Sequence, residues 1–303
     1  MSAIRALLAG SIDYAGLFPP AGLDMATAVE NYAGYRRGPA AWALGRFVLP
    51  VSRLSELEVA AARTIQEGPS PWSLSLLAGA DLPQDLEVIA EFSRRHSGPK
   101  RNLLADTIEA KGSSAGDIEN ILHRIPSTLQ AYIEIDINRD PRDLLAAVAR
   151  RGGRAKVRTG GITSEAFPSS SDLIRFVRCC VEADLPFKAT AGLHHPLRAE
   201  YRLSYEPDSP AGVMFGFLNL FLATAFLRVG MEEAEAARLL EEGSPESLDF
   251  DETGVAWKGH RLDLKALHDA RQSGVVSFGS CSFTEPIGDL EAMHLLGSGA
   301  RQG

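Results

Sequence analysis

Short apolar segments alternate with longer amphipathic segments along most of this chain, and this alternation is the feature that most constrains its fold. Short apolar runs bounded by turn residues are typical of buried strands, whereas apolar residues spaced three and four apart are typical of helices. Strands and helices in regular alternation predict a parallel sheet covered by helices. The runs that we interpret as inner strands are 45–50, 72–79, 102–110, 129–137, 155–161, 186–193 and 275–280.

The length of the chain favours one closed barrel over two separate units. The 303 residues fit an α/β fold of the (β/α)₈ TIM type, which commonly takes about 250 residues. We predict a single barrel domain over 1–303 with seven or eight inner strands. Residues 1–44 are predicted to form a loop and helix that close one end. Residues 196–262 are predicted to elaborate the basic pattern with helices and a hairpin.

Composition narrows the possible partners and the compartment. The net charge is −8, and the basic residues are scattered, so we expect no nucleic-acid or membrane partner. The chain has three cysteines and no CxxC motif: Cys179, Cys180 and Cys281. This pattern predicts a reducing, cytoplasmic location. The apolar stretch 211–227 is too short to cross a bilayer comfortably. It indicates a buried or interface helix, which makes a homo-oligomer a possible arrangement.

Charged residues interrupt three consecutive predicted strands in a regular pattern. Side chains alternate along a strand, so the polar residues of each strand share one face. We assign that face to the barrel interior near the carboxyl ends of the strands, where barrel enzymes have their active sites. A buried ion-pair network that fills the core is the alternative, although burying such charges without a function is costly. The residues concerned are Tyr132, Glu134, Asp136, Lys156, Arg158, Lys188 and Thr190.

Lys188 is the most informative member of this group. It lies between Phe187 and Ala189 and close to Lys156, so burial and like charge are expected to lower its pKa. A neutral amine can attack a carbonyl and form a Schiff base, and Asp136 is placed to move protons. We therefore predict covalent amine catalysis by Lys188, Asp136, Lys156 and Glu134, in a lyase that acts on a small, anionic carbonyl substrate without a cofactor.

The same strands resemble a known enzyme family. The segments EIDI (134–137), KVRTGG (156–161) and FKATAG (187–192) are similar to three successive strand ends of the deoxyribose-phosphate aldolase family of class I aldolases. The resemblance implies an aldolase-like barrel in which Lys188 forms the Schiff base, Asp136 shuttles protons and Lys156 supports Lys188. The next lysine-bearing strand of that family, with a KASGG-like turn, has no counterpart here.

Further residues at the predicted strand ends are candidates for binding the substrate. Arg158 suits a carboxylate or phosphate. Gly160 and Gly161 form either an anion-binding turn or simply a tight turn. Thr190 shares the inner face, and one of the adjacent residues His194 and His195 is a candidate acid or base. The turn at 278–280 is a candidate phosphate site.

A divalent metal is the alternative to amine catalysis. His194 or His195 could act as a ligand together with Glu134, Asp136 or Glu109, in a metal-dependent hydrolase or isomerase. The spacing includes neither HxH nor HExxH. A second alternative is a barrel that only binds a ligand and catalyses nothing.

Two more features each have both a functional and a structural interpretation. Cys281 follows the last predicted strand and is either a nucleophile activated by His194 or His195 or a small buried thiol. The segment DYAGLFPPA (13–21) is either a lid over the substrate or an apolar plug at the other end of the barrel.

Overall fold

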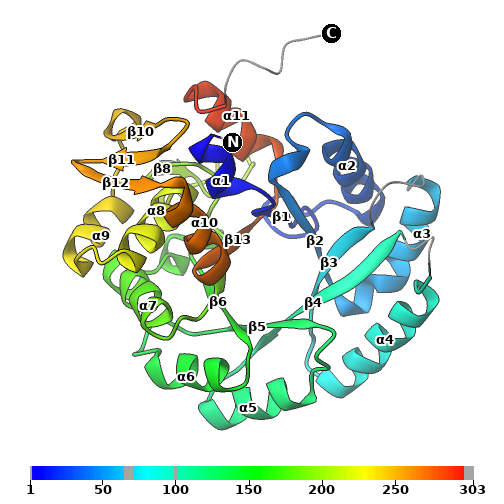
Figure 1. Cartoon of the computed structure of the whole chain (residues 1–303). Helices are drawn as coiled ribbons and strands as arrows, with labels where there is room; N and C mark the ends of the chain where they lie inside the picture. The colour runs from blue at the N-terminus through cyan, green and yellow to red at the C-terminus, as the bar shows by residue number, and fades with distance from the viewer. Residues whose placement is uncertain (1, 65–70, 99–101, 297–303) are drawn as a thin grey trace.

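Eight parallel strands close into a barrel in the computed structural model, which describes residues 2–64, 71–98 and 102–296. The strand order around the barrel is β1-β13-β7-β6-β5-β4-β3-β2, and helices surround it (Figure 1). The predicted α/β barrel of the TIM type is therefore confirmed. The strands are β1 (Ile12–Tyr14), β2 (Leu44–Pro50), β3 (Trp72–Leu77), β4 (Leu103–Lys111), β5 (Gln130–Glu134), β6 (Arg154–Arg158), β7 (Phe187–Thr190) and β13 (Val275–Ser280).

The first strand was missed by the sequence analysis. Ile12 of β1 pairs with Phe278 on one side and Leu44 on the other, so β1 closes the barrel. The prediction that residues 1–44 form only a loop and a helix at one end is therefore wrong. A strand of three residues is too short to show an alternating pattern. The other seven inner strands fall on the predicted runs.

Helices follow the strands and pack outside them. The helix after β1 is capped by Asp24, whose carboxylate accepts a hydrogen bond from the Thr27 backbone, and Asp81, Ser114 and Ser169 cap later helices in the same way. The outer helices are α2 (Met25–Arg37), α3 (Leu54–Thr64), α4 (Leu82–Arg95), α5 (Ala115–Arg124), α6 (Arg142–Arg150), α7 (Ser170–Glu182), α8 (Phe217–Arg228) and α11 (Thr284–Ala292); α1 (Ala3–Leu8) precedes β1 and α10 (Leu264–Ser273) precedes β13.

The segment between β7 and β13 carries the predicted elaboration. An antiparallel hairpin of β8 (Ala199–Arg202) and β9 (Ala211–Met214) comes first. After α8 and α9 (Glu233–Leu240), a three-stranded antiparallel sheet contains β10 (Leu248–Phe250), β11 (Gly254–Trp257) and β12 (His260–Asp263). Residues 211–214 are therefore a strand and not the start of the predicted helix, and the predicted hairpin has a third strand.

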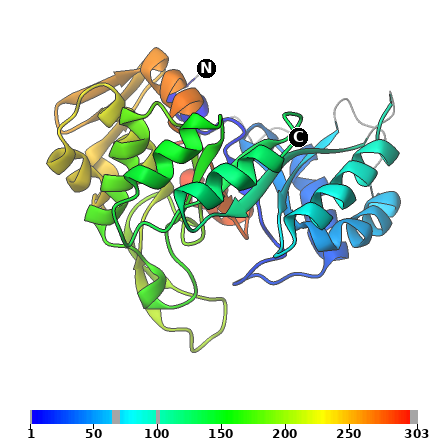
Figure 2. The same cartoon turned by 90° about the horizontal axis from the view of Figure 1, so that it is seen from below.

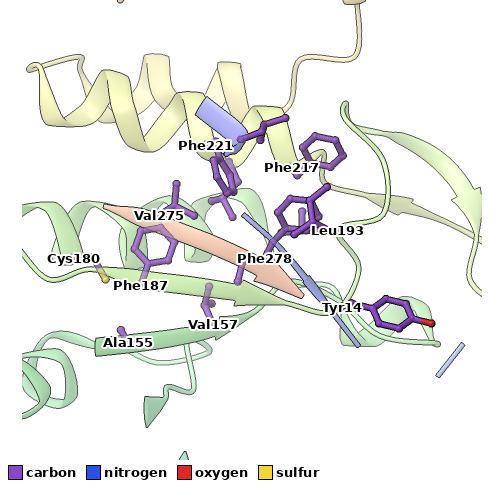
Figure 3. Close-up of a cluster of buried hydrophobic side chains, with 14 of the residues drawn as sticks. Tyr14, Ala155, Val157, Cys180, Phe187, Leu193, Phe217, Phe221, Val275 and Phe278 are labelled. Carbon is purple, nitrogen blue, oxygen red and sulfur yellow. The ribbon is translucent and has the colours of Figure 1, made fainter. Parts of the chain in front are cut away.

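Helix α8 is buried by the rest of the chain. Every residue from Phe217 to Leu227 is buried, and Phe217 stacks on Phe278 of β13 with ring centroids 4.8 Å apart. Figure 3 shows this apolar layer, in which Phe217 and Phe221 of α8 lie over Phe278 of β13. The apolar character of 217–227 is explained by this internal packing. Within residues 2–64, 71–98 and 102–296, no helix has the length and apolarity to cross a membrane.

The strand register places the polar residues at one level of the barrel. Lys156 is the partner of Lys188 across β6 and β7, and Ser277 of β13 is the partner of Lys188 on the other side. Glu134 pairs with Lys156 across β5 and β6. The intervening residues Val157, Phe187 and Ala189 are fully buried, and Figure 3 shows Val157 and Phe187 in the apolar cluster.

Candidate active site

A cavity of about 800 Å³ opens at the carboxyl ends of the barrel strands. Three segments extend around this end of the barrel: residues 15–24, the loop before α7 and the β8–β9 hairpin (Figure 2). Phe18, Pro19 and Pro20 line the cavity, so the segment 13–21 lies at the cavity and not at the opposite end. Polar lining residues are Glu109, Lys111, Glu134, Lys156, Arg158, Lys188, Thr190, His194, His195, Tyr201, Arg202, Ser204, Tyr205, Cys281 and Glu285.

Four charged side chains, Glu109, Glu134, Lys156 and Lys188, line the floor of the cavity. Together with Asp13, which is buried beneath them, they form what we call the lysine–carboxylate cluster. Lys188 Nζ lies 2.6 Å from Asp13 Oδ2 and 2.7 Å from Glu109 Oε1. Lys156 Nζ lies 2.7 Å from Glu109 Oε2 and 2.9 Å from Glu134 Oε2. Glu109 therefore bridges the two lysines, and each lysine also has a second carboxylate that the other lacks.

Neutral groups on three strands hold the carboxylates in place. Ser75 Oγ on β3 donates to Glu109 Oε1 at 2.6 Å, and Ser277 Oγ on β13 donates to Asp13 Oδ2 at 2.9 Å. The backbone N–H of Arg46 on β2 donates to Asp13 Oδ1 at 2.9 Å. Lys188 Nζ also lies 5.4 Å from the centre of the Tyr132 ring. Such buried, fully bonded polar groups are rigid.

The electrostatics of the cluster correct one prediction. Burial alone would lower the pKa of Lys188, but the carboxylates of Asp13 and Glu109 outweigh it and raise this pKa. The expectation of a lowered Lys188 pKa is therefore wrong for this state of the site. Burial would raise the pKa values of Glu109 and Glu134, yet the neighbouring lysines lower both. Lys111 Nζ lies 3.6 Å from Glu134 Oε1, so a third cation at the edge of the cluster also faces its carboxylates.

Asp136 lies outside the cluster, contrary to its predicted place beside Lys188. It is exposed, it is absent from the cavity lining, and its Oδ1 accepts hydrogen bonds from the Asn138 backbone and side chain at 3.0 and 2.8 Å. Strand β5 ends at Glu134, so the alternation that was extended to Asp136 no longer applies. Asp136 therefore does not take the proton-shuttle place that the aldolase resemblance implies for it, and the carboxylates next to Lys188 are those of Asp13 and Glu109.

Arg158 and Thr190 lie nearer to the mouth than the lysines. They are partners across β6 and β7, and both line the cavity. The Arg158 side chain is exposed, and in the described part of the chain it has no ion pair within 4 Å. A guanidinium in this position is available to an anionic group of a ligand.

The turn at Gly160 and Gly161 is closely packed. A Cβ on Gly160 would collide with the ring of Phe167, and one on Gly161 would come within 2.8 Å of the Ala166 side chain. Gly161 lines the cavity. The packing accounts for both glycines as a tight turn before η3 (Ser164–Ala166), which was the alternative to an anion-binding turn.

His194 faces the end of β13 and the start of α11. Its Nδ1 lies 3.3 Å from Ser280 Oγ, 3.8 Å from Cys281 Sγ and 3.5 Å from Glu285 Oε2. Burial, with a contribution from His195, lowers the pKa of His194 to about 4, so its ring is neutral near pH 7. Burial also raises the pKa of the Cys281 thiol, which therefore stays protonated.

His195 has a different set of partners, although both histidines line the cavity. Its Nδ1 lies 2.7 Å from Asp289 Oδ2 on α11, and its ring stacks on Tyr201 of β8 at 3.6 Å. Tyr205, from the same hairpin, lies 3.3 Å from Glu285 Oε2 and 3.6 Å from Cys281 Sγ. The hairpin is thus attached to α11 at two points.

The residues of the metal alternative are not gathered around one point. Glu134 is bonded to Lys156, Asp136 lies outside the cavity lining, and His194 and His195 face different partners. Throughout residues 2–64, 71–98 and 102–296, no group of three or more His, Cys, Asp or Glu side chains is arranged to hold a metal ion.

Comparison of the chain with protein-family models, with curated proteins and with solved structures finds no match. The strand topology shows the fold, and a barrel fold by itself assigns no reaction.

Proposed function

We propose that this protein is a lysine-dependent lyase of the aldolase type, in which Lys188 forms a Schiff base with a small carbonyl substrate. The observation that carries the proposal is the position of Lys188 Nζ, which is buried at the cavity floor between the carboxylates of Asp13 and Glu109. An amine at the base of a cavity with proton acceptors in contact is the arrangement that imine chemistry requires.

The carboxylates supply the proton transfers. Lys188 is an ammonium at rest, so it must first lose one proton, which Asp13 or Glu109 can relay to solvent. The free amine adds to the carbonyl carbon, the carbonyl π bond breaks, and the oxygen takes up protons and leaves as water. The iminium accepts the electron pair of the C–C bond one carbon away when that bond breaks, which gives an enamine. The hydroxyl on the departing carbon passes its proton to a carboxylate, and that fragment leaves as an aldehyde. The enamine then takes up a proton on carbon and becomes an iminium, and water hydrolyses this iminium to release the second product and free Lys188.

The substrate is expected to be anionic. Arg158 lies two residues beyond Lys156 on the same strand, roughly 7 Å nearer to the mouth, and it is exposed to the cavity. A carboxylate or phosphate bound there would hold a short chain with its carbonyl toward Lys188. The resemblance of 134–192 to the deoxyribose-phosphate aldolase family supports an aldolase-like reaction, and free thiols at Cys179, Cys180 and Cys281 fit the cytoplasm.

The test is reductive trapping. The protein is incubated with single small aldehydes, ketones and 2-oxo acids in the presence of sodium borohydride, and adducts are located by intact mass and peptide mapping. A stable adduct on Lys188 is expected. The adduct on that peptide should be absent from Lys188→Arg and retained in Lys265→Arg, because Lys265 is a surface residue paired with Asp269.

Two results would argue against the proposal. Labelling of Lys188 no faster than Lys265 would mean that its amine is not activated. Binding of a carbonyl ligand without any covalent adduct would favour the barrel that only binds.

A further inference from the structure

Lys156 has the same surroundings as Lys188, and this similarity extends the function just proposed. We propose that Lys156 is a second amine nucleophile, so that the enzyme holds two carbonyl compounds as imines side by side and joins them. The inference rests on the proposed Schiff-base chemistry at Lys188. It replaces the supporting role that the sequence analysis gave to Lys156.

The two lysines are matched in burial and in partners. Lys156 is 4% exposed and Lys188 is 2% exposed, and both line the cavity. Each has one oxygen of Glu109 at 2.7 Å. Each also has its own acceptor, Glu134 at 2.9 Å for Lys156 and Asp13 at 2.6 Å for Lys188. Glu134 also has Lys111 Nζ at 3.6 Å, and Glu109 is the acceptor that both buried lysines share.

The charge balance argues against a purely electrostatic role for Lys156. A supporting cation activates a neighbouring amine by like-charge repulsion. Here Glu109 lies between the lysines as a bridge, and Asp13 and Glu134 contact them from other sides. The repulsion is compensated, as the raised pKa of Lys188 indicates. Activation of Lys188 by like charge therefore does not account for Lys156.

The register brings the two amines close enough for a joint reaction. Lys156 and Lys188 are direct partners on adjacent parallel strands, and such strands lie about 4.8 Å apart. Both side chains point to the same carboxylate, so carbonyl carbons bound to the two nitrogens lie next to each other. The cavity of about 800 Å³ has room for two small molecules.

The reaction balances without any oxidant or reductant. Each carbonyl compound condenses with one lysine and releases one water. The imine on Lys188 loses a proton from its adjacent carbon to a carboxylate and becomes an enamine. The enamine carbon attacks the iminium carbon on Lys156, and the iminium electron pair moves to the Lys156 nitrogen.

Release of the product restores both lysines. The attacking carbon then loses a second proton, and a carbon–carbon double bond forms as the C–N bond to Lys156 breaks. Lys156 leaves as the amine. The remaining unsaturated imine on Lys188 takes up one water and is released as an unsaturated carbonyl compound. In sum, two carbonyl compounds give one unsaturated carbonyl compound and one water.

The first experiment counts trapped amines. The intact protein is treated with a low concentration of pyruvate and sodium cyanoborohydride, and adducts are mapped on the six lysines. We expect two adducts per chain, on Lys156 and Lys188. Lys156→Arg should keep the adduct on Lys188, Lys188→Arg should keep the one on Lys156, and Lys265→Arg should keep both. A stable adduct on Lys188 alone overturns the inference and leaves the proposed function standing, whereas no adduct on either overturns both.

A second measurement on the unmodified chain does not depend on folded variants. The probe 2,4-pentanedione has two carbonyl carbons separated by one carbon and can react with two neighbouring amines. We expect one probe molecule, minus two waters, to link the peptides that contain Lys156 and Lys188. Attachment of the probe to Lys188 without a link to Lys156 would show that the two amines do not react side by side, and would overturn the inference.

Discussion

Gly45 on β2 leaves the space that the carboxylate of Asp13 occupies. A Cβ at position 45 would collide with Asp13 Oδ1 and would lie 3.2 Å from the Asp13 backbone nitrogen. The same carboxylate binds Lys188 through its other oxygen. The position of a charged group at the cavity floor therefore depends on a missing side chain on the neighbouring strand.

Gly45→Ala should thus disturb the site as well as the fold. Adding a methyl group to a tightly packed interior costs about 1–3 kcal/mol, measured as the free energy of unfolding in denaturant. Displacement of Asp13 should also reduce trapping at Lys188. Gly34→Ala in α2 is the matched control, because a Cβ there meets nothing within 4 Å. Equal effects of the two substitutions would show that the space at Gly45 is not needed.

Removing the Lys188 charge should destabilise the barrel strongly. In Lys188→Met the buried carboxylates of Asp13 and Glu109 lose a shared cation, and breaking a buried pair in this way typically costs about 3–5 kcal/mol. Chemical denaturation measures the loss. Lys265→Met, at an exposed lysine, is expected to change stability by no more than about 0.5 kcal/mol. A loss of that small size at Lys188 would mean that the cluster is well hydrated.

The rate of trapping at Lys188 should rise with pH. The raised pKa of Lys188 leaves only a small neutral fraction at pH 7, and that fraction grows about tenfold per pH unit below the pKa. Adduct formation with a carbonyl that does not itself ionise should follow this slope between pH 7 and 9. A rate that is flat over this range would point to an amine already free at neutral pH.

The stability of the fold should fall toward acid because of Glu109 and Glu134. Their pKa values are lowered in the folded chain, so the unfolded chain binds protons first as the pH drops. Their contribution is complete above the ordinary carboxyl pKa of about 4.3 and is lost as the pH falls through the folded values. Denaturation at pH 6 and pH 3 measures the difference. The Glu109→Gln variant should show a smaller loss over the same interval.

The contact between His195 and Tyr201 should control access to the cavity. His195→Ala removes both the stacking on Tyr201 and the bond to Asp289, so the β8–β9 hairpin loses one of its two attachments to α11. Limited proteolysis between residues 203 and 210 should become several-fold faster. His268→Ala is the control, since His268 bonds only to Gln272 among its described neighbours. Unchanged cleavage in His195→Ala would show that Tyr205 alone holds the hairpin.

The sequence predicted the barrel because its repeating pattern is local. Seven strands show apolar runs of ordinary length. Glu134, Lys156 and Lys188 each interrupt one of three such runs, at a position that alternation along the strand assigns to the inner face. These residues lie at the cavity as predicted. Strand β1 was missed because three residues carry too little pattern to distinguish a strand from a loop.

The pairing of charges could not be predicted from the same pattern. Alternation shows which face a side chain occupies, but not which strands are neighbours across the barrel. Asp13 and Lys188 come from strands that are not adjacent in the barrel, and their contact raises a pKa that was expected to fall. The error at Asp136 is of another kind. Strand β5 ends at Glu134, two residues earlier than the pattern assumed, so the side chain of Asp136 is exposed.

Asp13 draws its partners from across the whole chain, with Lys188 at a separation of 175 residues and Ser277 at a separation of 264. During synthesis the first strand leaves the ribosome long before either partner exists. The Asp13 carboxylate can therefore contact both Lys188 and Ser277 only when β13 has been made and the barrel is closed. Assembly of the cavity floor and closure of the barrel are then one event, and a chain interrupted before β13 would have helices and strands but no finished active site.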